Sequence, residues 1–174
     1  MRWSSTRPSR SSAVRLAIAG LVCWLVAHAA SRAAAAPLDA QFAVIASAGV
    51  PVDDLTFEEL RRVFLFKRSV WRPGQPVYVI LPDSGLPART FLLKHIYRMS
   101  GEDFRRFILE RIFQAEIDFA PKVVGSDSEA VAFVKAGRSI VAMVSATASH
   151  PPDVKVLRID GKLPRETGYR LVDR

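Results

Sequence analysis

The chain has 174 residues, with 25 lysines and arginines against 17 aspartates and glutamates, a formal net charge of +8. Five of those arginines lie in the first 36 residues, where no acid occurs, so the remaining chain has 20 cations and 17 acids, a net charge of +3. These charges are interspersed in short pairs, which excludes the basic stripe of a nucleic-acid-binding protein. The remaining length is sufficient for one domain with a hydrophobic core.

The first 36 residues have the pattern of a secretory signal peptide. Leu16–Ala27 is an apolar run too short to span a bilayer comfortably, and Ala33–Ala35 supplies an A-x-A cleavage site. Cys23 lies inside this run after Val22, which does not fit a lipoprotein signal. We therefore expect a cleaved signal peptide over residues 1–36, export to the periplasm, and a single domain over residues 37–174. Four basic residues precede the apolar run: Arg2, Arg7, Arg10 and Arg15.

Beyond residue 36 the chain lacks the residues of a metal or disulfide site. It has no cysteine, and its two histidines, His95 and His150, are far apart in the sequence. Their spacing fits no zinc motif, and no disulfide can form in this part of the chain. We expect neither a metal nor another cofactor.

The first part of this domain predicts a strand followed by a helix. Gln41–Ala46 is a short apolar run typical of a strand, and Ser47–Pro51 is a turn of small residues. Thr56 and Glu59 then have the spacing of a capping box, which marks the start of a helix. Ser69–Pro76 is a polar connection, in which Trp71 is expected to anchor the chain to the core.

A second strand, turn and helix follow. Val77–Leu81 predicts a buried strand, Pro82–Gly85 a turn, and Pro87 the first turn of a helix. This arrangement directs free backbone N–H groups and the positive end of a helix dipole at whatever lies above the turn. The helix has an apolar stripe at three- and four-residue spacing: Phe91, Leu92, His95 and Ile96.

The remaining elements are two helices and three strands. A helix over Ser100–Phe113 is predicted to bury Phe104, Phe107, Ile108 and Ile112. After the short strand Val123–Val124, Ser126 and Glu129 form another helix start, and Val131, Phe133 and Val134 are expected inside that helix, which ends at Gly137. Ser139–Val144 and Val154–Ile159 are predicted strands, and residues 162–174 receive no assignment. This order predicts an α/β fold with a mixed, mostly parallel sheet flanked by helices.

Three segments resemble the periplasmic phosphate-binding proteins of ABC importers, which have the type II solute-binding fold. Thr56–Val77 is similar to that family's L-x-x-E-L-x-x-I-F-x-G-K-x-x-x-W-x-x-G-x-x-I segment. The turn before Phe91 stands where the family has an R-S-x-G-S-G-T-x-x-F phosphate loop, and Gly137–Val144 where it has G-x-I-G-Y-V. The resemblance covers residues 41–160, is closest to a short exported subgroup, and implies a reduced binding-protein fold, an oxyanion ligand and an ABC transporter partner.

The chain departs from the family's pattern at several positions. Leu81 stands where the phosphate loop begins with arginine, and Gly85-Leu86-Pro87 replaces Ser-Gly-Thr. Phe66 stands at a usual glycine, and Ala142-Met143 replaces Gly-Tyr. The resemblance also implies that this chain lacks the N-terminal segments that supply part of the ligand site in full-length binding proteins.

The main functional hypothesis is a phosphate-like oxyanion site made by turns at strand ends. Backbone N–H groups would come from Ser47–Gly49, Ser84–Gly85 and Ser126, with hydroxyls from Ser84 and Ser126. Arg89 would add charge-assisted hydrogen bonds, and Asp83 would accept a proton from phosphate. The simpler alternative treats both serines as helix caps, Asp83 as a turn residue and Arg89 as a solvated side chain.

Two other functions were weighed against oxyanion binding. The fold could serve as an envelope interaction or sensory module without anion affinity, which an exposed apolar patch around Phe64, Phe66 and Trp71 would favour. Catalysis is not expected, because the sequence has no G-x-S-x-G motif and no plausible Ser-His-Asp set. His95 belongs to an apolar helix stripe, where a structural histidine is commoner than a catalytic base.

Overall fold

The computed structural model describes residues 40–117 and 120–173. The predicted signal peptide, residues 1–36, lies outside these ranges. The strands are β1 Ala40–Ser47, β2 Asp54–Leu55, β3 Val70–Arg72, β4 Gln75–Pro76, β5 Tyr78–Pro82, β6 Val123–Val124, β7 Ile140–Ser145, β8 Val154–Val156, β9 Arg158–Ile159 and β10 Val172–Asp173. The helices are α2 Phe57–Phe64, α3 Pro87–Phe91, the π-helix η1 Leu92–Tyr97, α4 Gly101–Phe113 and α5 Asp127–Ala136.

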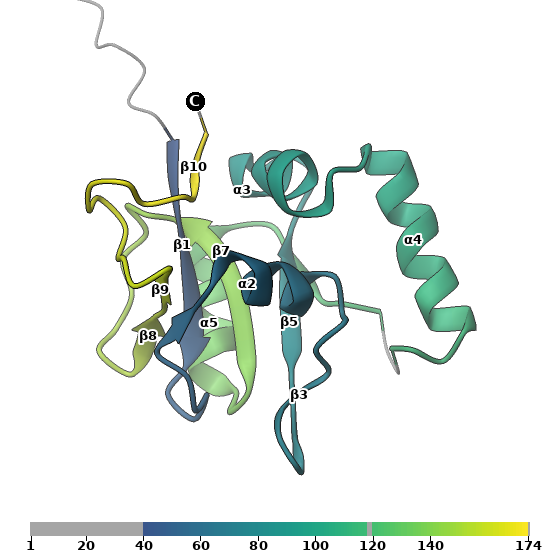
Figure 1. Cartoon of the computed structure of the whole chain (residues 1–174), viewed down its shortest axis with the longest axis horizontal. Helices are drawn as coiled ribbons and strands as arrows, with labels where there is room; N and C mark the ends of the chain where they lie inside the picture. Colours follow the sequence, from purple (N-terminus) through teal and green to yellow (C-terminus); the bar gives the residue numbers. More distant parts are fainter. Residues whose placement is uncertain (1–39, 118–119, 174) are drawn as a thin grey trace, which may run out of the picture. The chain divides into compact units, whose positions relative to one another are not determined.

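The main sheet has the strand order β10-β1-β7-β5-β6, and β8 also pairs with β1 (Figure 1). Strand β5 runs parallel to β7 and to β6, whereas β1 runs antiparallel to β7, β8 and β10. The sheet is therefore mixed, as expected from the sequence. The antiparallel share is larger than expected, because all three neighbours of β1 come from the C-terminal part of the chain.

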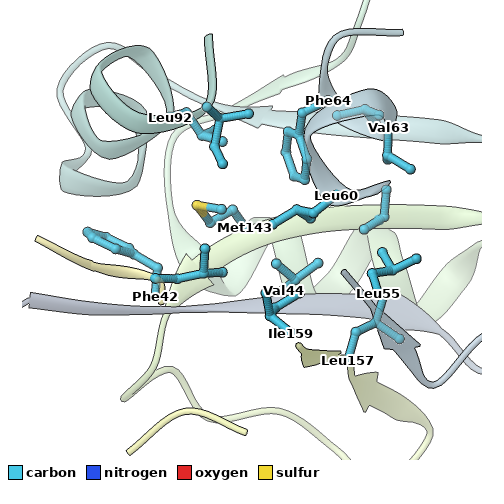
Figure 2. Close-up of a cluster of buried hydrophobic side chains, with 14 of the residues drawn as sticks. Phe42, Val44, Leu55, Leu60, Val63, Phe64, Leu92, Met143, Leu157 and Ile159 are labelled. Atoms are coloured by element: carbon cyan, nitrogen blue, oxygen red, sulfur yellow. The ribbon is translucent and has the colours of Figure 1, made fainter. Parts of the chain in front are cut away.

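Side chains of the sheet alternate between two cores. On one face, Phe42 and Val44 of β1 and Met143 of β7 pack against helices α2, α3 and η1 (Figure 2). On the other face, Ile45 of β1 and Val144 of β7 pack against α5. The period of two along each strand thus places helices on both sides of the sheet, which confirms the predicted α/β architecture.

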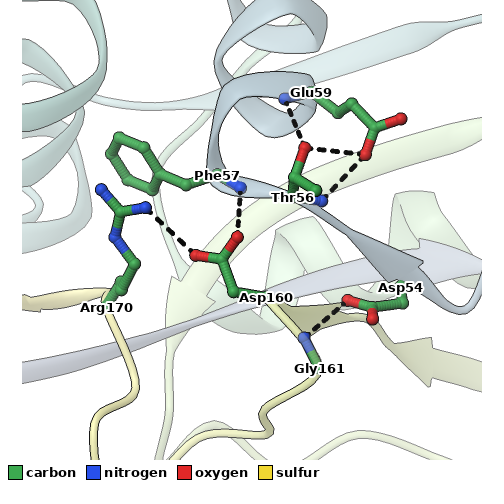
Figure 3. Close-up of polar contacts among 7 residues, drawn as sticks. All are labelled: Asp54, Thr56, Phe57, Glu59, Asp160, Gly161 and Arg170. Carbon is green, nitrogen blue, oxygen red and sulfur yellow. Dashed lines mark hydrogen bonds and ion pairs between the residues drawn. The ribbon is translucent and has the colours of Figure 1, made fainter.

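Helix α2 begins at the predicted capping box and is tied to a distant loop. Thr56 Oγ1 accepts from the Glu59 N–H, and Glu59 Oε2 accepts from the Thr56 N–H at 2.9 Å. Asp160, from the loop after β9, accepts a further hydrogen bond from the Phe57 N–H at 3.0 Å and from Arg170 at 3.2 Å (Figure 3). These bonds satisfy N–H groups of the first turn, which have no acceptor within the helix.

Several local predictions differ from the structure. The connection Ser69–Pro76 contains a hairpin of β3 and β4, although Trp71 is buried as predicted. The predicted strand Val154–Ile159 breaks at Leu157, so that β8 pairs with β1 and β9 with β2. Phe133 is 36% exposed, and Ala130 takes the inward position on α5 instead. The unassigned tail supplies β10, which pairs with the first residues of β1.

Helix α4 packs less closely than its sequence suggests. Phe104 is its one buried residue, whereas Phe107, Ile108 and Ile112 are only partly buried. Among the described residues, no helix is long and apolar enough to cross a membrane.

Candidate functional site

The carboxyl ends of β5, β6 and β7 meet at one edge of the sheet. The parallel register pairs Pro82 of β5 with Val124 of β6 and Ile80 of β5 with Ala142 of β7. Just beyond the β5 strand, the Asp83 N–H donates to the Val124 carbonyl at 2.8 Å. The loops after these three strands therefore form a continuous edge, which we call the carboxyl edge. It contains four of the predicted ligand residues: Asp83, Ser84, Gly85 and Ser126.

The Asp83–Gly85 loop is folded around its own carboxylate. Asp83 Oδ1 accepts from the Gly85 N–H at 3.1 Å and lies 3.4 Å from Ser84 Oγ. The backbone N–H groups of Gly85 and then Ser84 lower the pKa of Asp83, and the Arg89 charge lowers it further. Asp83 is exposed and stays ionised at neutral pH, with its oxygen where these N–H groups converge.

The loops after β6 and β7 show the same chemistry. Ser126 Oγ accepts from the Glu129 N–H at 3.1 Å, and Glu129 Oε2 accepts from the Gly125 N–H at 2.8 Å. Asp127 Oδ2 accepts from the Ser145 N–H at 3.1 Å, at the end of β7. The loops after β5 and β6 and the last residue of β7 thus each have a backbone N–H bound to a carboxylate oxygen. Ser126 also caps α5, so its simpler role as a helix cap is present in the structure.

Arg89 lies on the first turn of α3 but is not a solvated side chain. Its guanidinium carbon lies 4.2 Å from the centre of the Phe104 ring, a cation–π contact. Its Nη1 is buried and has no hydrogen-bond partner among the described residues. Burial lowers the pKa of Arg89 below its ordinary value, which the nearby Tyr97 and Asp83 partly offset.

The structure does not place Ser47 with the other predicted ligands. Because β1 runs antiparallel to β7, Ser47 lies beside Ile140 at the start of β7, at the opposite edge from Asp83. Ser47 is fully buried, donates to the Val134 carbonyl at 2.7 Å and accepts from the Ile140 N–H at 3.2 Å. Ser47 is therefore not part of the carboxyl edge, because the end of an antiparallel strand lies at the opposite edge from the ends of its parallel neighbours.

The carboxyl edge also includes residues that the sequence analysis missed. Asp127 and Ser145 link the loops after β6 and β7, and Ser145 Oγ lies 2.8 Å from Thr147 Oγ1. Their positions in the sequence could have indicated this, because Asp127 and Ser145 each come shortly after a predicted strand. The described residues contain no group of three His, Cys, Asp or Glu side chains suited to a metal ion.

Two hollows in the surface lie away from the carboxyl edge. One, of about 580 Å³, is lined by residues of η1 and α4 such as Leu93 and Asp103. The other, of about 450 Å³, is more apolar and is lined in part by Phe66, Tyr78 and Phe133. Volume alone would favour these hollows, but neither contains the converging N–H groups of the strand ends.

The fold is similar to that of solved phosphate-transport proteins. A phosphate ABC transporter substrate-binding protein from Clostridium perfringens, with bound phosphate, matches 77% of this chain with a TM-score of 0.60 and 14% identity. An ABC-type phosphate transport receptor from Vibrio cholerae matches 76%, with a TM-score of 0.60 and 17% identity. PstS from Borrelia burgdorferi matches 78%, with a TM-score of 0.61 and 14% identity.

The chain shares its fold with these binding proteins. It spans only about half of their length, since the matches cover 53%, 54% and 55% of the three solved chains. No protein-family model matches the sequence, and the comparison with curated proteins gives no match. The expected resemblance is therefore confirmed for the fold.

Proposed function

We propose that this protein binds a phosphate-like oxyanion at the carboxyl edge of β5, β6 and β7. The observation that carries the proposal is that a backbone N–H at the carboxyl end of each of these strands, in the loops after β5 and β6 and at the last residue of β7, already binds a carboxylate oxygen. N–H groups arranged in this way favour anionic oxygen, whether it belongs to the chain or to a ligand. The shared fold supports the same conclusion, since one similar structure is described with bound phosphate.

In this proposal the ligand takes the place of the Asp83 carboxylate oxygen. Phosphate would accept from the Ser84 and Gly85 N–H groups, and the Ser84 and Ser126 hydroxyls would donate to its other oxygens. Asp83, turned aside, would accept the proton that phosphate retains at neutral pH. An aspartate carboxylate is ionised at neutral pH, so the displaced Asp83 is available as an acceptor there.

The same arrangement would select phosphate over sulfate. Sulfate carries no proton at neutral pH, so it would leave the Asp83 carboxylate facing another anionic oxygen without a hydrogen between them. An unpaired charge of this kind is unfavourable. Specificity would therefore depend on Asp83, whereas affinity would depend on the N–H groups and hydroxyls.

We place this function in the periplasm, as a component related to ABC-type phosphate uptake. The leader-like residues 1–36 support export, and the fold likeness supports a link to transport. No catalytic role is proposed. A partnership with an ABC transporter permease is also part of the proposal.

Serine substitutions at the carboxyl edge test the proposal directly. The double substitution Ser84→Ala with Ser126→Ala should weaken phosphate binding in a calorimetric titration, since two hydroxyl donors are removed. Ser128→Ala is the matched control, because Ser128 is exposed on α5 and makes no contact with the strand-end loops described above. Equal phosphate affinity in the double variant, the control and the original protein would show that the site lies elsewhere.

A second candidate function, an envelope protein-interaction module, is favoured by one observation. Of the patch expected around Phe64, Phe66 and Trp71, Phe64 is fully buried, Trp71 nearly so and Phe66 partly buried, so this patch does not support the candidate. On α4, however, Leu109 is 54% and Phe113 86% exposed. This candidate predicts that no oxyanion stabilises the protein, and that Phe113→Ser abolishes a specific crosslink to an envelope protein in intact cells.

A further inference from the structure

Helix α4 is attached to the domain mainly through Phe104, with Phe107 and Ile108 packing only partly against the same core. Within its thirteen residues, all of which the structure describes, Phe104 is the one buried side chain. The Phe104 ring lies 4.4 Å from the ring of Tyr97 at the end of η1. Beside this contact, η1 and α4 are separated by the open hollow of about 580 Å³. The position of α4 therefore depends largely on how the Phe104 ring is packed.

That ring also covers Arg89. The contact between Phe104 and the guanidinium is short, yet Nη1 of Arg89 and Oη of Tyr97 are both buried without a hydrogen-bond partner among the described residues. Buried donors that lack an acceptor are unfavourable and are uncommon in folded proteins. The packing of α4 thus keeps Arg89 in a position that leaves its Nη1 without a hydrogen-bond acceptor among the described residues.

Arg89 is also near enough to the carboxyl edge for its charge to lower the pKa of Asp83. It lies on the turn that follows the Asp83–Gly85 loop, six residues along the chain from Asp83. A rotation of its long side chain away from Phe104 would bring the guanidinium toward an anion held by this loop. A bound oxyanion would supply the acceptor that Arg89 lacks under α4.

We propose that α4 controls the oxyanion site by holding Arg89 under Phe104. Arg89 would not contact Phe104 and bind an oxyanion at the same time. Packing of α4 and oxyanion binding therefore oppose one another. This inference rests on the proposed oxyanion function and assigns its regulation. Any factor that lifts α4 would raise oxyanion affinity, and oxyanion binding would loosen α4.

The size of the effect follows from the equilibrium between packed and released α4. If only the released form offers Arg89 to the ligand, the apparent dissociation constant equals the intrinsic one divided by the released fraction. A variant that releases α4 in most molecules should therefore bind more tightly. We expect a gain on the order of threefold to tenfold, the range available when the released form is a minor population.

Phe104→Leu is the principal test, because leucine keeps an apolar anchor but has no ring face for the guanidinium. Phe107→Leu is the matched control: the same change on the same helix, at a ring that Arg111 rather than Arg89 covers. Titration of each purified protein with inorganic phosphate should show tighter binding for Phe104→Leu and unchanged binding for Phe107→Leu. In an Arg89→Met background, Phe104→Leu should no longer change the affinity.

Hydrogen exchange provides a second readout that needs no variant. Adding phosphate to the original protein should speed amide exchange in residues 101–113, although ligand binding ordinarily slows exchange. This measurement also covers the case in which a Phe104 variant fails to fold.

The outcomes separate this inference from the proposed function. If phosphate binds but Phe104→Leu binds equally or more weakly, or α4 exchanges no faster, the regulation by α4 is wrong and the oxyanion site stands. If no protein in the series binds phosphate, both are wrong.

Discussion

Asp160→Ala should be among the more destabilising single substitutions outside the hydrophobic core. The Asp160 carboxylate accepts from the Phe57 N–H at 3.0 Å and pairs with Arg170 at 3.2 Å. Losing a charged acceptor from a partly buried N–H costs about 2 kcal/mol, and the exposed ion pair adds roughly 0.5 kcal/mol. Asp160 also has a φ of 52°, where alanine is less favourable than aspartate by about 1 kcal/mol. The expected loss in the free energy of unfolding is therefore about 3–4 kcal/mol.

Asp160→Asn provides the comparison that tests this reasoning. Asparagine tolerates the left-handed conformation and keeps an oxygen for the Phe57 N–H, so it should cost only about 1 kcal/mol. Urea unfolding followed by circular dichroism gives both values, provided the two variants share the m-value of the original protein. If both substitutions cost the same, or if Asp160→Ala costs less than about 1 kcal/mol, the loop after β9 does not stabilise the start of α2 as described.

Three further predictions concern single residues. Phe66 has a φ of 58°, so Phe66→Gly should be more stable than Phe66→Ala by about 1 kcal/mol in urea unfolding, and the reverse order would contradict the structure. Hydrogen bonds from Lys94 and then His95 lower the pKa of Asp173 in the folded protein. The ionised carboxylate therefore stabilises the fold at pH values above the pKa of an unfolded aspartate, about 3.9, and this stabilisation is lost as the pH falls below that value. Asp173→Asn should therefore lower the thermal midpoint at pH 7 but not at pH 2, and an equal shift at both would refute the role of the charge. Asp83→Asn should bind sulfate as well as phosphate, whereas the original protein should prefer phosphate from pH 5 to pH 8. Calorimetric titration with each anion distinguishes these outcomes.

Local signals in the sequence predicted the elements with strong end markers. The capping box at Thr56 and Glu59 fixed the start of α2, and Ser126 fixed the start of α5, because side-chain acceptors at these positions satisfy otherwise unpaired N–H groups. Trp71 was expected to be buried, and it is. In each case the interaction lies within a few residues of the chain or follows from hydrophobicity alone.

Features that depend on strand direction could not be predicted from the same signals. Ser47 was grouped with Asp83 because both end a strand, and only the antiparallel pairing of β1 with β7 places them at opposite edges. The short strand β10 is specified by its pairing with β1 rather than by its own composition. Arg89 has a sequence position typical of a solvated residue, and its burial depends on Phe104, from a different helix.

The likeness to solved binding proteins lies in the fold, whereas the sequence of the Asp83–Gly85 loop departs from the family's phosphate loop. Gly85 and Ser84 retain N–H groups suited to an anion, but here Asp83 occupies them. In the proposed site, an external oxyanion would therefore compete with an intramolecular carboxylate. This competition is the reason that the function must be measured with graded ligand concentrations and ionic controls.

Thermal unfolding of residues 37–174, with phosphate, sulfate or chloride at matched ionic strength, tests the central claim most directly. A ligand at 100 times its dissociation constant stabilises a protein by about 2.7 kcal/mol, which for a domain of this size raises the midpoint by roughly 10 °C. The account predicts a rise with phosphate that sulfate and chloride do not produce. Equal midpoints in all three salts at every concentration would contradict it.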